Sequence, residues 1–236
     1  MFFVLSFVLM LFSMDSVLCE ICDITDPDCT TKGAKNNYGS FVNGIDNIVE
    51  ASDPLWIDEV EDKRDTITYK LTNASLSGMK DCDVMSMKVD ITALTFLYNL
   101  QCPHVVVKSD YEVNGNILTL HVEGKGIVTV TADDYVFLFD CHYEKTVDDD
   151  GNVHVQITSH HFDVETKGTV RFEYTNLFNG DKEKSDLVHN FINENSKEMV
   201  KLFRTPTIDK FADLFIANLN KFFKALPVQK LLPSKS

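Results

Sequence analysis

The amino-acid sequence predicts an α+β protein in which a curved antiparallel β-sheet wraps around an apolar C-terminal helix. Two patterns along the chain support this. Between residues 55 and 174, apolar and polar residues alternate with a period of two, which is typical of strands with one solvated face. After Asn179-Gly180, apolar residues recur at three- and four-residue steps, as on one side of a helix. A bent sheet that encloses an apolar helix accounts for both patterns.

Turn signals divide the strand region. The alternation is clearest in residues 66–71 and 153–158. Asn114-Gly115 stands between two strand-like runs and predicts a two-residue hairpin turn, and Asp149-Asp150-Gly151-Asn152 predicts a second hairpin tip. The glycines of residues 124–126 interrupt a strand pattern and predict a bulge or sharp bend, which would let the sheet curl.

A short helix is expected before the strands, within residues 30–50. Gly39 and Gly44 are expected to interrupt it. Asp53-Pro54 is expected to end it, because a residue before proline avoids the helical region. Its apolar side is expected to carry Phe41, Ile45 and Ile48.

The last helix has clear start and stop signals. Thr205 is the expected N-cap, Pro206 the first helical residue, and Pro227 the stop. Its apolar stripe is broader than that of an ordinary surface helix. Because each large apolar side chain gains about 1.5–3 kcal/mol only when it is buried, this helix should be largely enclosed.

The N-terminus predicts secretion. The apolar run Phe2–Phe12 is shorter than the ~20 residues that cross a bilayer, and it has the length of the apolar core of a signal peptide. Val17 and Cys19 suit the positions three and one before a cleavage site, so cleavage is expected after Cys19. The alternative is a hydrophobic N-terminal strand of the mature fold. The mature chain, residues 20–236, is expected to form one domain that is soluble and extracellular.

The cysteines agree with an oxidising compartment. Cys22 and Cys29 flank a turn-forming Asp-Pro pair and predict a local disulfide. Once Cys19 is removed, Cys82, Cys102 and Cys141 remain, an odd number. One of these thiols is therefore either buried and free or paired between chains, and the sequence leaves the choice open.

The charge of the chain excludes several partner classes. The formal net charge is −14, from 36 acidic and 22 basic residues. Such a surface repels nucleic-acid backbones and anionic membrane faces, so neither nucleic-acid binding nor stable membrane insertion is expected.

No catalytic or metal-binding pattern is apparent, and no enzyme activity or cofactor is expected. The sequence has no G-x-S-x-G, no H-E-x-x-H and no phosphate-binding glycine loop. His160 and His161 would point to opposite faces of a strand, which argues against a shared metal ion. The acidic run at residues 148–150 lacks a closing glutamate for calcium and is better interpreted as a solvated turn. Asn73-Ala74-Ser75 is a glycosylation sequon.

Four stretches of the chain resemble the insect takeout and haemolymph juvenile-hormone-binding proteins, within the tubular lipid-binding superfamily. They are the Cys22–Cys29 spacing, Gly44-Ile45 followed by Asp53-Pro54-Leu55, the run SDYEVNGNILTLHVEGKG at residues 109–126, and the run NLFNGDKEKSDLVHNFINEN at residues 176–195 with the later Phe222-Phe223 and Pro227. They occur in the expected order over nearly the whole mature chain and lean toward the takeout branch.

The resemblance implies a highly curved antiparallel β-sheet wrapped around a long C-terminal α-helix, with an internal hydrophobic tunnel. It also implies a carrier of a small hydrophobic ligand, such as a juvenile-hormone-like terpenoid, a fatty acid or another lipid. The three cysteines Cys82, Cys102 and Cys141 do not match a disulfide pattern of the family, and the hormone carriers' polar ligand contact has no matched residue here.

Bulky residues of the strands and the last helix are the candidates for the ligand-binding lining. They are Trp56, Phe96, Tyr98, Val106, Tyr135, Phe137, Phe139, Tyr143, Phe215 and Phe222. Tyr98, Tyr135 and Tyr143 are the best polar contacts, because a buried phenol needs a partner. Each candidate has ordinary core packing as its alternative, and Trp56 could instead cover one end of the barrel.

Two other functions stay open. A secreted interaction or defence protein could use the same fold to bind microbial lipid or a cell-surface receptor, although a basic tip for anionic lipid heads is missing from this acidic chain. A lipid-modifying hydrolase would need a nucleophile and base, and no pattern in the sequence supplies them.

Overall fold

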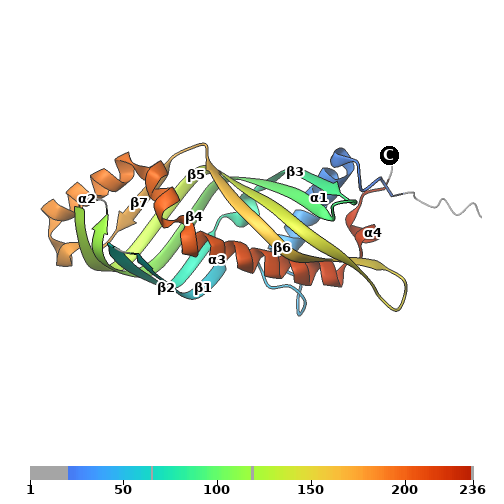
Figure 1. Ribbon diagram of the computed structural model, residues 1–236, viewed down its shortest axis with the longest axis horizontal. Helices are drawn as coiled ribbons and strands as arrows, with labels where there is room; N and C mark the ends of the chain where they lie inside the picture. The colour runs from blue at the N-terminus through green and yellow to red at the C-terminus, as the bar shows by residue number, and fades with distance from the viewer. Residues whose placement is uncertain (1–20, 65, 118–119, 235–236) are drawn as a thin grey trace, which may run out of the picture.

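The computed structural model describes residues 21–64, 66–117 and 120–234 (Figure 1). The predicted signal peptide, residues 1–19, lies outside the described residues. The helices are α1 (Pro27–Val42), α2 (Lys182–Glu194), α3 (Ser196–Ala225) and α4 (Val228–Leu231), with 3-10 turns η1 (Met79–Asp81) and η2 (Phe178–Gly180). The strands are β1 (Leu55–Arg64), β2 (Ile67–Ser77), β3 (Asp83–Asp90), β4 (Thr95–Ile117), β5 (Leu120–Val147), β6 (Val153–Thr166) and β7 (Val170–Tyr174).

One seven-stranded antiparallel sheet forms most of the molecule, in the order β1-β2-β4-β5-β6, with β3 on β4 and β7 on β5. The long strands β4 and β5 pair from Thr95–His142 to Ile117–Leu120 and run almost the length of the molecule (Figure 1). The sheet is not closed. Helix α3 packs against β1 and β6, the first and last strands of that order (Figure 1). The expected α+β fold, a curved antiparallel sheet wrapped around a long C-terminal helix, is confirmed.

Asparagine side chains join the helices to the edges of this sheet. Asn220 of α3 accepts a hydrogen bond from Ile157 N (2.7 Å) and donates one to Ile157 O (3.0 Å) on β6. Asn193 of α2 does the same for Phe172 of β7, at 2.7 and 3.0 Å. A side-chain amide thus takes the place of a neighbouring strand and satisfies backbone groups that an edge would otherwise leave unpaired.

The N-terminal helix differs from its prediction at both ends. It begins at Pro27, where Asp26 caps Asp28 N, continues through Gly39 and ends at Val42. Gly44 has a φ of +82°, and a Cβ there would lie 2.7 Å from Val49 O, so a tight turn follows the helix. Ile48 consequently lies outside the helix and is exposed, contrary to the expected apolar side.

One hairpin turn lies where it was expected. Asp148 N donates to Asn152 O and Gly151 N to Asp148 O, which closes the β5–β6 tip. The Asn114-Gly115 prediction is wrong in position. Those residues lie inside β4, and pairing continues to Ile117, so the connection falls at residues 118–119, outside the described residues.

Close backbone approach explains the three strand glycines. A Cβ on Gly115 would lie 2.2 Å from Thr66 O, and one on Gly126 would lie 2.5 Å from Thr175 O. The β4–β5 register continues through Gly124 and Gly126 without a shift, so the predicted bulge is absent from this described stretch. Glycine is needed here because another segment crosses closely.

The C-terminal helices divide at a different residue from the one expected. The break lies at Asn195, whose Nδ2 donates to Phe191 O (2.8 Å) at the end of α2, and α3 then runs through Thr205-Pro206. Met199 and Phe211, before and after this pair, are both buried, so core packing holds the helix on either side of it. The predicted stop at Pro227 is confirmed, because α3 ends at Ala225.

Two disulfides fasten the structure. Cys22–Cys29 forms as predicted, and Cys82 pairs with Cys102. Cys141 is a fully buried thiol with no disulfide partner in the described part of the chain. Cys22 N also donates to Pro233 O (3.0 Å), which joins the two ends of the described chain.

Candidate ligand-binding site

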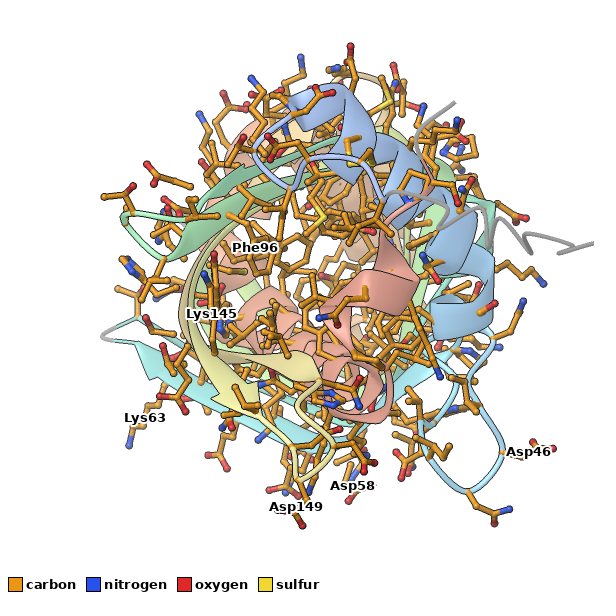
Figure 2. The ribbon with its side chains drawn as sticks, turned by 90° about the vertical axis from the view of Figure 1, so that its right-hand side faces the viewer. Asp46, Asp58, Lys63, Phe96, Lys145 and Asp149 are labelled. Atoms are coloured by element: carbon orange, nitrogen blue, oxygen red, sulfur yellow. A yellow bond between two sulfur atoms is a disulfide. The ribbon has the colours of Figure 1, made fainter. Side chains whose placement is uncertain are left out.

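Two internal cavities lie between the sheet and α3, one toward each end of that helix. The α1-side cavity has a volume of about 100 Å³ and is lined by residues of α1, β3, β4, β5, β6, α3 and α4. The residues that line it are Ile24, Thr30, Gly33, Ala34, Asn37, Tyr38, Phe41, Met87, Val89, Phe96, Tyr98, Tyr143, Val155, Leu219, Phe222, Phe223, Val228, Leu231 and Leu232. Figure 2 views the molecule from this end, and Phe96 points inward while Asp46, Asp58 and Asp149 point outward.

Local structure explains why these residues meet. Phe96 and Tyr98 are two apart on β4 and therefore face the same side of the sheet. Leu219, Phe222 and Phe223 are three and four apart on α3 and therefore share the helix face turned toward the sheet. The lining is almost entirely carbon, and none of the described lining residues is charged.

Tyr143 supplies an unused polar group in the α1-side cavity. Its hydroxyl is buried and has no hydrogen-bond partner among the described residues. Burial, and secondly the charge of Asp90, raise the pKa of this phenol, so it is a neutral hydrogen-bond donor at physiological pH. Tyr38 differs, because its hydroxyl donates to Met79 O at 2.5 Å.

The α2-side cavity is larger, at about 130 Å³, and is lined mainly by valines and aromatic residues. Its lining residues are Tyr69, Leu71, Leu76, Val105, Val107, Tyr111, Val113, Val122, Val128, Val130, Ala132, Tyr135, Phe137, Val170, Phe172, Tyr174, Leu177, Ile192, Val200, Thr207 and Ile208. Tyr111 Oη donates to Thr175 O (2.7 Å), and burial raises the pKa of Tyr111 to about 12. Thr207 Oγ1 is buried without a hydrogen-bond partner in the described structure.

A layer of phenylalanines lies between the two cavities. Phe215 of α3 stacks on Phe139 of β5, with ring centroids 5.2 Å apart, and meets Phe41 of α1 edge-on at 5.1 Å. We call Phe41, Phe139 and Phe215 the aromatic wall. Beside it, a void of about 10 Å³ is lined by Phe139 and Phe215 on this side and shares Phe137 and Ile208 with the α2-side cavity.

The structure distributes the ten predicted lining residues over these places. Phe96, Tyr98, Tyr143 and Phe222 line the α1-side cavity, and Tyr135 and Phe137 line the α2-side cavity. Phe139 and Phe215 belong to the aromatic wall. Trp56 and Val106 line none of the three described spaces.

The positions of Trp56 and Val106 differ from the prediction that they line the ligand site, and strand alternation explains both differences. Trp56 is 60% exposed because it lies between Leu55 and Ile57, which are buried on the other face of β1. Val106 lies between Val105 and Val107, which face the α2-side cavity, so Val106 faces away from it. In a run of three valines, the composition does not reveal which residues point inward.

Sequence reasoning missed Tyr38 and Thr207 as lining residues. Thr207 had a detectable signal, because it lies four residues before Phe211 and eight before Phe215 on the buried side of α3. Tyr38 lies in a helix of mixed composition, and its position depends on how α1 packs against β3.

No helix within residues 21–64, 66–117 and 120–234 is long and apolar enough to cross a membrane. In the same ranges, no three His, Cys, Asp or Glu residues are grouped closely enough to hold a metal ion.

Comparison with known proteins agrees with this geometry. Residues 2–233 match the model of the haemolymph juvenile hormone binding protein (JHBP) family. The circadian clock-controlled protein daywake of Drosophila melanogaster is 27% identical over 187 residues, which cover 73% of this chain and 71% of daywake. The crystal structure of Takeout 1 from Epiphyas postvittana has a TM-score of 0.83 and 27% identity, covering 89% of this chain and 97% of that one. With its open sheet, enclosed helix and apolar interior, the chain belongs to the haemolymph juvenile-hormone-binding protein family, a family of hydrophobic-ligand carriers.

Proposed function

We propose that this protein is a secreted carrier of a small hydrophobic ligand, such as a juvenile-hormone-like terpenoid, a fatty acid or another lipid. The observation that carries the proposal is a pair of cavities with apolar walls between the sheet and α3, in a fold of this family. An apolar ligand that leaves water for such a cavity gains about 25 cal/mol per Å² of buried surface. Binding of this kind needs no chemical step, and the proposed carrier is not an enzyme.

The α1-side cavity is the proposed site for the ligand's polar end. Phe96, Tyr98 and Phe222 would contact its carbon chain, while the unpartnered Tyr143 hydroxyl would donate to an oxygen of the ligand. Because the described lining carries no charge, the oxygen that fits is neutral, as in an ester, ether, ketone or alcohol. A fatty acid would enter this cavity in its protonated form.

Secretion is supported by two disulfides, which persist in oxidising compartments, together with the expected cleavage after Cys19. The sequon asparagine Asn73 is exposed on β2, where its side chain donates a hydrogen bond to the exposed Asp110 (3.1 Å). We therefore propose Asn73 as a glycosylation site of the secreted protein.

Displacement of a fluorescent fatty-acid probe from wild type and Tyr143→Phe tests the proposal. For a terpenoid ester, the variant should bind about three- to tenfold more weakly, the worth of one hydrogen bond. The matched control is Ser109→Ala, which removes a buried hydroxyl that donates to Thr72 O outside both cavities and should leave ester binding unchanged. Failure of wild type to take up either probe or ester would contradict the carrier function.

A further inference from the structure

We infer that the α2-side cavity is a second, independent ligand site, which takes a short, neutral, apolar molecule with one oxygen hydrogen-bonded to Thr207. The chain would then carry two ligands at once. This inference rests on the proposed carrier function and adds to it the number of ligands and the chemistry of the second one.

The two cavities are separate spaces. Their described linings share no residue. Between them stands the aromatic wall, whose buried rings are in direct contact at centroid distances of 5.1 and 5.2 Å. The void beside the wall measures about 10 Å³, roughly the space of one water molecule. A flexible chain that fills one cavity therefore stops at the wall.

Thr207 marks where a ligand's polar atom would lie. Its side chain is 5% exposed, and Oγ1 lacks a hydrogen-bond partner within the described residues. Buried hydroxyls are nearly always hydrogen-bonded, since a missing bond costs free energy. Thr30 shows the usual situation in this protein, because it is 2% exposed and donates to Met87 O at 2.6 Å. The unused hydroxyl of Thr207 faces a cavity, so a bound molecule would supply the missing partner.

The lining determines the class of this molecule. None of the described residues that line the α2-side cavity is Lys, Arg, His, Asp or Glu, so an ionised head group would remain unpaired there. A threonine hydroxyl both donates and accepts. Medium-chain alcohols, ketones and aldehydes meet these conditions, whereas long fatty carboxylates do not.

The test uses 1-decanol and n-undecane, which have the same number of non-hydrogen atoms and differ by one hydroxyl. Headspace gas chromatography over the purified secreted protein gives the number bound per chain and the affinities. Wild type should bind two molecules of decanol. Thr207→Val should weaken one of the two sites for decanol by about five- to tenfold, the worth of one hydrogen bond, and leave undecane binding unchanged. Tyr143→Phe should weaken only the other site.

Three outcomes would overturn the inference. One decanol per chain, weakened by Tyr143→Phe and not by Thr207→Val, would remove the second site and leave the carrier function intact. If Thr207→Val weakened the binding of decanol and of undecane equally, the variant would have lost packing contacts and not a hydrogen bond to the ligand. A single molecule that both variants weaken would mean one ligand spanning the wall. Absence of any binding would instead contradict the proposed function itself.

Discussion

At the scale of single residues, two buried threonines differ only in their partners. Thr30 donates to Met87 O, and Thr207 has no partner in the described structure. Replacing Thr30 by valine removes the shorter of the two hydrogen bonds that Met87 O accepts, 2.6 Å from Thr30 against 3.3 Å from Thr31, and should lower the free energy of unfolding by about 1 kcal/mol. In the ligand-free protein, Thr207→Val should leave the free energy of unfolding unchanged or raise it by about 1 kcal/mol. Urea unfolding of both variants checks this, and an equal loss in both would contradict the idea of an unused hydroxyl.

The sequence identified residues best where their chemistry was unusual. Phe96 and Tyr98, predicted as lining residues for their bulk, do face the interior from β4, although the residue between them, Leu97, is apolar and exposed. The same reasoning from bulk fails for Val105, Val106 and Val107, which are all apolar. Trp56 is exposed although it is the only tryptophan, because its place in the β1 alternation outweighs its size.

At the scale of elements, the asparagine contacts to the sheet edges make a second prediction. Asn220→Ala removes two hydrogen bonds to Ile157 and leaves backbone groups of β6 unpaired, so stability should fall by about 1–3 kcal/mol. Amide hydrogen exchange at Ile157 should accelerate as well. Asn36→Ala, on the exposed side of α1, is the control and should change neither quantity. Unchanged exchange at Ile157 would show that α3 does not hold the edge in this way.

The β5–β6 hairpin predicts a pH dependence. His154 Nδ1 lies 3.1 Å from Phe223 O and Nε2 lies 3.2 Å from Asp148 Oδ2. Both partners accept hydrogen bonds, so only the protonated ring satisfies both. The backbone carbonyl of Phe223, and then Asp148, raise the pKa of His154. Hydrogen bonds from Asn152, first from its side chain and then from its backbone, lower the pKa of Asp148 to about 2, with His154 contributing.

Stability from the raised His154 pKa is therefore fully present below its unfolded pKa of about 6.5 and lost as the pH rises through the folded value. Stability from Asp148 is present above about pH 4 and lost as the pH falls toward 2. The stability difference between wild type and His154→Gln should thus be largest near pH 4–6 and shrink at higher pH. Thermal unfolding across this range tests it, with His121→Gln as an exposed control. If the stability difference between wild type and His154→Gln grew above pH 7, the protonated His154 ring would not be the stabilising form.

Element boundaries were the weakest part of the prediction from sequence, for identifiable physical reasons. The α2–α3 break lies at Asn195 and not at Thr205-Pro206, because packing around Met199 and Phe211 outweighs a local start signal. Asn114-Gly115 has the composition of a hairpin turn, yet Gly115 is needed where β4 crosses closely past Thr66. Both depend on contacts between distant parts of the chain.

At the scale of the whole molecule, the fold class was predictable, because the two periodicities leave few arrangements that bury both apolar faces. The pairing of Cys82 with Cys102 was not, since the sequence does not show which strands are neighbours. The separation of the interior into two cavities could not be predicted from the sequence either, because the aromatic wall combines Phe41, Phe139 and Phe215 from three elements that are far apart in the sequence.

We expect the aromatic wall to limit the length of ligand that the protein accepts. Phe215→Leu should open a passage between the cavities and let a twenty-carbon alcohol bind across it, gaining about 0.8 kcal/mol for each methylene buried beyond the wall. Wild type should prefer ten-carbon alcohols. Phe191→Leu, which shortens a partly buried phenylalanine of α2 that lines none of the three described spaces, is the matched control. Isothermal titration with both alcohols compares the three proteins, and an unchanged length preference in Phe215→Leu would show that the wall does not limit the ligand.

Native mass spectrometry of the protein secreted from insect cells, followed by solvent extraction and identification of bound molecules, tests the central claim most directly. We expect a chain that begins at Glu20 and carries neutral, oxygen-bearing apolar molecules, with one or two bound per chain. A protein that is free of ligand as secreted, and that takes up neither a fatty-acid probe nor a terpenoid ester, would contradict the account. The cavities would then be packing defects of a scaffold that works through its surface.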